Sequence, residues 1–468
     1  MLRALLAALT LTAALGTAAA PAPATPRSPP ESERLAHDIL AELVGIDTTH
    51  ARGDAKAAEA LIARFRAAGF PDADLFIGGP KPDKMNVVVR LRGTTKAPAV
   101  LFNAHLDVVE ATRDTWTVDP FTLTEKDGYY WGRGTLDVKN EVAIFSANLI
   151  RLRREGWKPA RDVILAFNVD EEAGGDAPGV EWLLKEQRPR VEAGLVINAD
   201  AGHGQSRAGV RLWNAMQTSE KVYATYSLTT HGRGGHSSVP WPDNPIARLA
   251  QAIVRLNAYE FPVRLSETTR GYLAAYAGRV GGEEADAIRA ILANPADPEA
   301  AKRLRGARVL NAQLHSTCPV TVVAGGQSES ALPIKAQATI QCRLLPDEKP
   351  EEVLATFRRV IADPGVEIGV EFAPLASPPA TLDPAVTEVV ERVTREMWPG
   401  VPVVPVMSAG ASDNVFWRGA GLKTYGVSGT FVDENDLRAH GNDERVSIAA
   451  FYESLEFSYR LMRALAGR

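Results

Sequence analysis

Three apolar runs of strand length each end in side chains that can bind a metal ion. The runs cover residues 99–104, 162–169 and 193–199, and they lead respectively to His105 and Asp107, to Glu171 and Glu172, and to Asp200. Near-continuous apolar runs are typical of strands covered on both faces, as in a parallel sheet. In open α/β sheets, ligands bind beyond the carboxyl ends of such strands. We therefore expect the imidazole and the carboxylates to share one pocket with metal-site chemistry.

The size and composition of the chain narrow the class of protein. Its 468 residues exceed one ordinary domain, so two or three domains are expected. The hydrophobic content of 45% and the charged content of 23% are those of a globular protein with a sizeable core. The net charge of −5 gives no electrostatic reason to expect nucleic acid or an anionic membrane as a partner. Cys318 and Cys342 belong to no Cys/His cluster, which argues against a thiolate zinc site.

The N-terminus has the pattern of a secretory signal peptide. Residues 1–3 are a short basic start, residues 4–16 are apolar but too few to span a bilayer, and small residues follow. We predict a signal peptide over residues 1–24, cleaved after Ala24, and a secreted or periplasmic protein without membrane attachment. An uncleaved anchor is the alternative. In an oxidising compartment Cys318 and Cys342 could pair, but the sequence does not settle their spacing.

The pattern of helices and strands changes near residue 213. Before it, the sequence predicts helices over 31–46, 54–68 and 139–154 and a strand over 85–91. After it, the predicted order is strand 223–230, helix 245–257, strands 317–324 and 336–343, helix 350–362 and strand 366–372. Residues 258–310 add a helical segment, and the last helix is expected over 447–466.

These patterns predict two interleaved domains. The first is an α/β catalytic domain, residues 25–212 and 375–468, with a mixed, mainly parallel sheet and helices on both faces. The β-α-β-β-α-β order of residues 213–374 predicts an inserted α+β domain with an antiparallel, ferredoxin-like sheet, which serves as a lid or dimerisation domain.

Each metal-binding side chain has a specific chemical use. The pair His105 and Asp107 fits a ligand imidazole whose second ring nitrogen is held by a carboxylate. On a turn, Glu171 and Glu172 point in different directions, so one can bind metal while the other acts as general base. Asp137 follows two glycines and could be a ligand or a helix N-cap. A carboxylate can bridge two zinc ions, so the set predicts a two-metal centre.

The same residues resemble the aminoacylase / carboxypeptidase S family of co-catalytic zinc hydrolases. The resemblance rests on six segments in the family order, namely residues 105–107, 132–139, 170–172, 198–200, 235–238 and 440. It implies two Zn²⁺ ions per subunit, one held by His105 and Asp200 and the other by Glu172 and His440. Asp137 would bridge them, Asp107 would orient His105, and Glu171 would act as general base.

The resemblance also implies residues outside the metal centre. His236 is similar to the family histidine that stabilises the oxyanion, often from the partner subunit of a homodimer. Arg343 resembles the arginine that binds a substrate carboxylate, and Asn311 is a weaker candidate for substrate binding. His203 and His231 are predicted to be non-catalytic. Asp200, where many relatives have glutamate, and the long helical segment leave substrate and dimer geometry open.

The sequence thus predicts a secreted two-zinc hydrolase of amide or peptide bonds. The favoured substrates are a short peptide, cut as by a carboxypeptidase, or an N-acyl amino acid. Aminopeptidase, dipeptidase and esterase action on the same site are the enzymatic alternatives. A non-catalytic peptide-binding protein is the alternative of another class, and it is disfavoured because Glu171 and all five predicted ligands are present.

Overall fold

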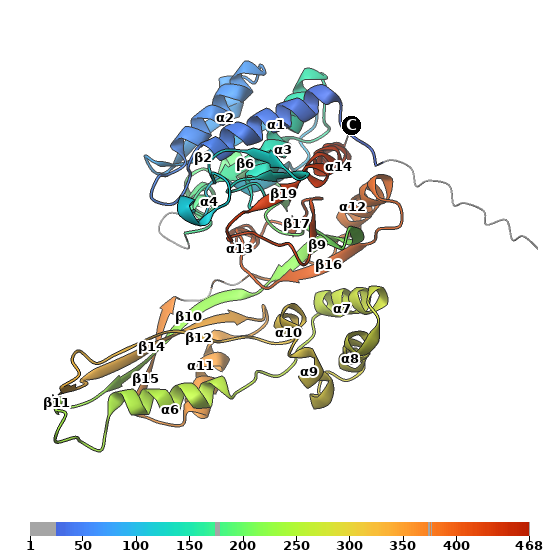
Figure 1. The fold of residues 1–468 in the computed structure, drawn as a ribbon. Helices are drawn as coiled ribbons and strands as arrows, with labels where there is room; N and C mark the ends of the chain where they lie inside the picture. Colours follow the sequence, from blue (N-terminus) through green and yellow to red (C-terminus); the bar gives the residue numbers. More distant parts are fainter. Residues whose placement is uncertain (1–24, 174–177, 373–374, 376, 468) are drawn as a thin grey trace, which may run out of the picture.

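The computed structural model describes residues 25–173, 178–372, 375 and 377–467. The predicted signal peptide lies outside the described residues. Figure 1 shows a sheet with helices on both sides, from which a long, narrower part extends. Within the described part of the chain, no helix is long and apolar enough to cross a membrane.

The larger part is built on a ten-stranded mixed sheet. Its central strands β6 (Val163–Asn168), β3 (Val100–His105) and β7 (Leu195–Asn198) run parallel, and Phe102 pairs with Leu165 on one side and Ile197 on the other. The full order is β1 (Leu75–Lys81), β2 (Lys84–Leu91), β6, β3, β7, β17 (Thr424–Gly426), β9 (Val210–Glu220), β8 (Gly204–Arg207) and β18 (Phe431–Asp433), with β16 (Val403–Ser408) also paired to β9. The predicted mixed α/β fold is confirmed.

Helices cover both faces of this sheet because its central strands alternate between two cores. Val100 and Phe102 belong to one core, whereas Leu101 and Ile164 belong to the opposite one. The first core contains residues of α1 (Pro30–Gly45), α2 (Ala55–Ala67), α3 (Lys139–Arg154), α12 (Pro384–Met397) and α14 (Ile448–Ala466). The second contains residues of α4 (Gly179–Glu186), α5 (Arg188–Val191) and α13 (Asn414–Gly419) or the loops beside them. The strands are therefore buried on both faces, as their near-continuous apolar sequences predict.

The extended part is the lid, defined here as one antiparallel sheet with two helices. The sheet order is β12 (Val320–Gly325), β14 (Lys335–Leu344), β10 (Val222–His231) and β15 (Val366–Phe372), and the helices are α6 (Pro245–Asn257) and α11 (Pro350–Ile361). This order confirms the ferredoxin-like prediction. Both helices pack on one sheet face with Tyr226, Ile340 and Cys342. Because side chains alternate along a strand, Arg343 lies on the opposite face.

A disulfide and a short two-stranded ribbon complete the lid. Cys318 and Cys342 form a disulfide that joins the segment before β12 to β14. At the far end, β11 (Gly235–His236) pairs with β13 (Ala331–Leu332), and Figure 1 places this ribbon far from the large sheet.

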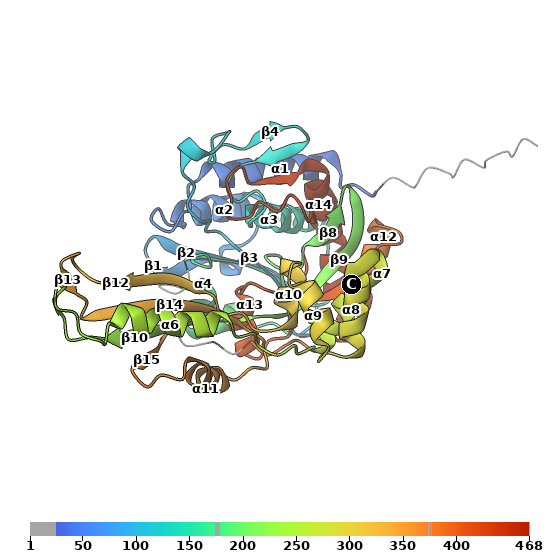
Figure 2. The same ribbon diagram turned by 60° about the horizontal axis from the view of Figure 1, so that its bottom comes forward.

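The helical segment between the lid strands packs on the large sheet. It forms α7 (Glu267–Arg279), α8 (Gly282–Ala293), α9 (Pro298–Leu304) and α10 (Arg308–Leu314). Their apolar side chains share a core with Trp213 of β9 and Val404 of β16, and Figure 2 shows α7 beside β9. The expected boundary between residues 212 and 213 falls inside β9, which belongs to the large sheet.

Three short strands form a separate small sheet beside the loops that carry Asp137 and His440. The strands β4 (Thr124–Lys126) and β5 (Tyr129–Trp131) form a short hairpin, and β19 (Arg445–Ser447) pairs with β5. Two short 3₁₀ turns, η1 (Asp72–Asp74) and η2 (Arg113–Thr115), complete the described elements.

Candidate metal centre

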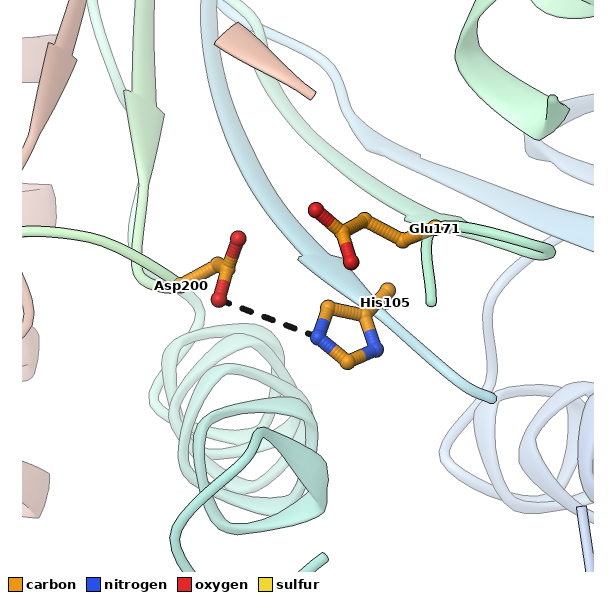
Figure 3. A group of neighbouring side chains, drawn as sticks. All are labelled: His105, Glu171 and Asp200. Atoms are coloured by element: carbon orange, nitrogen blue, oxygen red, sulfur yellow. Dashed lines mark ion pairs between the residues drawn. The ribbon is translucent and has the colours of Figure 1, made fainter. Parts of the chain in front are cut away.

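The carboxyl ends of the three central strands meet at one edge of the large sheet. His105 is the last residue of β3, Glu171 follows β6, and Asp200 follows β7. Figure 3 shows the Glu171 and Asp200 carboxylates directed toward the His105 ring. Donor atoms of these three residues all lie within 4.8 Å of one another.

Asp107 holds both the imidazole and the glutamate turn. His105 Nδ1 lies 2.9 Å from the Asp107 carbonyl oxygen and 3.7 Å from its carboxylate. The carboxylate accepts the backbone N–H groups of Glu171, at 3.2 Å, and Glu172, at 2.9 Å. With Nδ1 donating to the carbonyl, Nε2 of His105 keeps its lone pair for a metal ion. The contact with the glutamate turn is one that the sequence did not indicate.

The backbone conformation before Glu171 directs the side chains of Glu171 and Glu172 to different parts of the cluster. Asp170 has φ of +61°, a left-handed conformation that reverses the chain direction. Its buried carboxylate pairs with Nζ of Lys84 at 2.9 Å and with Nδ1 of His50 at 2.7 Å. Glu171 then lies with Asp200, whereas Glu172 lies 2.9 Å from Nε2 of His440.

Asp137 lies between the two imidazoles. Its Oδ1 is 3.2 Å from His105 Nε2, and its Oδ2 is 3.1 Å from His440 Nε2. A second donor group, His105, Asp137 and Glu172, also fits within 4.8 Å. The two donor groups with His440 thus form a pair of adjoining sites, and Asp137 presents one oxygen to each side. This is the placement a bridging carboxylate requires.

Charges within the cluster are strongly coupled. Burial, and then the nearby Asp200 carboxylate, raise the pKa of Glu171 well above its usual value. Hydrogen bonds to Asp137 and Glu172 raise the pKa of His440 to about 10. Burial raises the pKa of Asp413, the residue directly before α13, to about 8. Four carboxylates and two imidazoles around one space are a donor set suited to divalent cations, whose charge offsets the carboxylate repulsion.

Glu444 supports the metal-binding loops, and sequence reasoning missed it. This fully buried carboxylate accepts the backbone N–H groups of Gly134, Leu136 and Asp137 at 3.1, 2.7 and 3.0 Å. It also pairs with Arg133 at 2.7 Å. Because Glu444 follows His440 by four residues, it ties the loop of Asp137 to the loop of His440. Its only sequence signal is the proximity to His440.

Replacing Glu444 with alanine is expected to lower the free energy of unfolding by about 3–5 kcal/mol, because Arg133 would remain buried without its partner. Metal affinity should fall as well, because Asp137 loses its positioned backbone. Urea unfolding and metal analysis measure the two effects. Glu396→Ala, which removes two surface ion pairs, with Arg392 and Arg460, should cost less than about 1 kcal/mol. Equal, small effects of the two substitutions would contradict this role of Glu444.

A cavity of about 670 Å³ opens from the metal-binding cluster toward the lid. Its lining includes Glu171, Glu172 and His440 of the cluster and Arg343 of β14. The Arg343 guanidinium rests over the Tyr223 ring at 4.8 Å. The remaining lining comes from both the lid and the large sheet. Its larger apolar members are Pro178, Val222, Phe372, Leu375, Val415 and Phe416, and its polar members are Asp170, Glu181, Glu220, Lys221, Ser377, Ser412 and Asp413.

Other candidate residues lie apart from the cluster. His236 is exposed at the far end of the lid, where its Nδ1 contacts Ser238 at 2.8 Å. Asn311 lies on α10 and contacts His315 at 3.1 Å, and it does not line the cavity. His231 is exposed beside Glu367. His203 follows Asp200, and burial lowers its pKa.

A buried hydrogen-bond group around Glu220 joins the lid connections to the floor of the cavity. Glu220 is the last residue of β9, where the chain enters the lid. Its carboxylate accepts hydrogen bonds from Ser377 Oγ at 2.7 Å, Ser412 N at 2.9 Å and Arg418 at 3.2 Å. Ser377 lies where the chain leaves the lid again after β15. We call these four residues the Glu220 group.

Comparison with known proteins decides the family. The model of peptidase family M20/M25/M40 matches residues 101–464. The chain belongs to this family. The predicted resemblance is thus confirmed, and with it the class of metallopeptidases and amidohydrolases.

Similar proteins cover most of the chain. It is 27% identical over 375 residues to human N-fatty-acyl-amino acid synthase/hydrolase PM20D1, with 78% of this chain and 73% of the relative covered. It is 28% identical over 387 residues to probable carboxypeptidase S-like 2 of Dictyostelium discoideum, with 78% and 71% covered. The M20 family metallo-carboxypeptidase Sso-CP2 of Sulfolobus solfataricus has the same fold, with a TM-score of 0.68, 18% identity and coverage of 91% and 98%.

Proposed function

We propose that this M20-family hydrolase removes the C-terminal residue of a short peptide or cleaves an N-acyl amino acid. The observation that carries the proposal is the position of Asp137 between His105 and His440, beside a cavity that also contains Arg343. The relatives named as an N-fatty-acyl-amino acid synthase/hydrolase and a carboxypeptidase S-like protein support these two substrate classes.

The donor set fits two divalent ions, and we propose zinc. His105, Asp200 and Asp137 would hold one ion, and Glu172, His440 and Asp137 the other. When bound, such ions polarise the scissile carbonyl and lower the pKa of a water molecule. Imidazole and carboxylate are both good zinc ligands.

Glu171 is the proposed general base. Its carboxylate borders the cluster and lines the cavity, so it can take a proton from the attacking water and deliver it to the departing nitrogen. Asp107 would keep His105 and the glutamate turn in place. Arg343 would bind the free carboxylate of the substrate, because a guanidinium matches a carboxylate with two parallel hydrogen bonds.

The proposal includes export and a homodimer. The Cys318–Cys342 disulfide supports export, because disulfides persist in oxidising compartments. His236 is exposed at the tip of the lid, distant from the cluster of its own chain. A second copy could therefore receive this histidine as an oxyanion donor, with Asn311 as a further candidate for substrate binding.

A substrate panel tests the function directly. We expect the zinc-loaded protein to release amino acid from N-acyl amino acids or C-terminally free dipeptides, and to be slower by at least about tenfold on the matching C-terminal amides, since an unpaired Arg343 disfavours them. Dialysis against a chelator should abolish turnover and added Zn²⁺ should restore it. Preference for substrates with a free amino group and a blocked carboxylate would favour the aminopeptidase alternative instead.

A further inference from the structure

We propose that Lys221 is a second cationic contact for the free carboxylate of the substrate, acting beside Arg343 in the same cavity. The inference rests on the proposed function and assigns a specificity role to a residue at the junction between β9 and β10. It makes Lys221 and Arg343, which both line the cavity, one site formed by two cations.

The position of Lys221 is unusual for an ammonium group. Only 1% of the residue is exposed, yet it lines the cavity together with Arg343, Val222 and Tyr223. Its Nζ donates one hydrogen bond, at 2.8 Å, to the backbone carbonyl of His315. An ammonium has three donors, so this single neutral acceptor leaves capacity for an anionic ligand.

Among the residues that the structure describes, no carboxylate lies within ion-pair distance of either cation, although the charge of Glu348 is near enough to raise the pKa of Lys221. Arg343 contacts the Tyr223 ring, and Lys221 contacts the His315 carbonyl. Three other buried cations have carboxylate partners, namely Arg133 with Glu444, Arg418 with Glu220 and Lys84 with Asp170. Buried Lys139 instead donates to the two backbone carbonyls of Leu43 and Ile46, one more acceptor than Lys221 has. Burying an unpaired charge is costly, and two neighbouring cations add repulsion. A bound carboxylate would remove both costs.

The charges along the cavity give the bound substrate a direction. The charge of Glu171 acts on Arg343, and Arg343 in turn lowers the pKa of Lys221, which the carboxylate of Glu348 raises. Burial is the main reason that the pKa of Lys221 falls to about 8, a value at which it is still mostly charged at neutral pH. The acidic metal centre therefore marks the scissile bond, and the Arg343–Lys221 end marks the terminal carboxylate.

Binding to a variant with slowed turnover tests this role. We would measure Kd of metal-loaded Glu171→Gln protein for N-hexanoyl-L-leucine and for its carboxamide, with and without Lys221→Met. The expected result is a rise of about tenfold in Kd for the acid and a change below about twofold for the carboxamide. Lys221→Arg should restore most of the affinity for the acid. The matched control is Lys335→Met, at the exposed start of β14, which should change neither value.

The outcomes separate this inference from the proposed function. Equal losses for the acid and the carboxamide would show a purely structural role for Lys221, through His315, and would overturn the inference. Unchanged affinity for the acid, or a Glu171→Gln parent that binds no acid, would also overturn it. A third outcome is that Lys221→Met selectively weakens binding of the acid although the wild-type protein cleaves no substrate. This outcome would refute the proposed function and still support the carboxylate site.

Discussion

Replacing Glu171 with glutamine is expected to lower kcat by about 10²–10⁴-fold, the usual contribution of a general base. Glutamine keeps the size and hydrogen-bonding reach of the side chain but cannot accept the proton. The bound metal should remain at its wild-type content, because Asp137, Asp200, Glu172 and the two imidazoles are unchanged. Steady-state kinetics with elemental analysis of the same sample gives both quantities.

Metal content decides between two roles that the geometry allows Glu171. Its carboxylate shares a donor group with His105 and Asp200, so it could also bind an ion directly. Loss of one metal ion together with activity would assign Glu171 as a ligand and refute its role as base. Glu181→Gln is the matched control, because Glu181 lines the same cavity, is exposed and should leave kcat unchanged.

Replacing Asp137 with alanine is expected to have the largest effect on metal binding. Losing a partner that merely orients a ligand costs about 10–100-fold in metal affinity or activity, so removal of a shared ligand should cost at least about 100-fold. We expect the metal content to fall to one ion or fewer per chain, because Asp137 lies between His105 and His440 and would contact both ions. Elemental analysis after gel filtration measures the content.

A control and a clear contrary result accompany this substitution. Asp119→Ala removes an exposed ion pair with Arg113 and should leave the metal content unchanged. Two metal ions retained by Asp137→Ala would contradict the bridging role. Circular dichroism of each variant shows whether the fold is intact, so that a folding defect is not mistaken for the loss of a ligand.

The location of the candidate site was predictable because it depends on strand ends. The apolar runs before His105, Glu171 and Asp200 are neighbouring parallel strands, so their ends necessarily meet. The lid sheet was predictable for a similar reason, since its element order allows few topologies. The prediction that 213 begins the lid domain used the change in pattern there, but the strand β9 continues to Glu220 before the lid sheet starts.

The supporting residues could not be found in this way because their roles depend on distant chain segments. Glu444 acts through a loop that lies more than three hundred residues earlier, and its own sequence surroundings are ordinary. Lys221 looks like any lysine at the end of a strand until β14 brings Arg343 beside it. The sequence also could not show that α7–α10 would pack on β9 and β16, because an amphipathic helix does not specify which surface covers it.

The Glu220 group has a consequence for protein engineering. It fastens both connections of the lid to the Ser412 loop and to Arg418 in α13. The lid is consequently a poor candidate for exchange between homologous enzymes as an isolated cassette. A chimaera joined at residues 221 and 376 would combine the lid of one enzyme with the Glu220 group and the cavity floor of the other. Grafts that transfer segments 217–380 and 408–418 together would carry all four residues of the Glu220 group from the same enzyme.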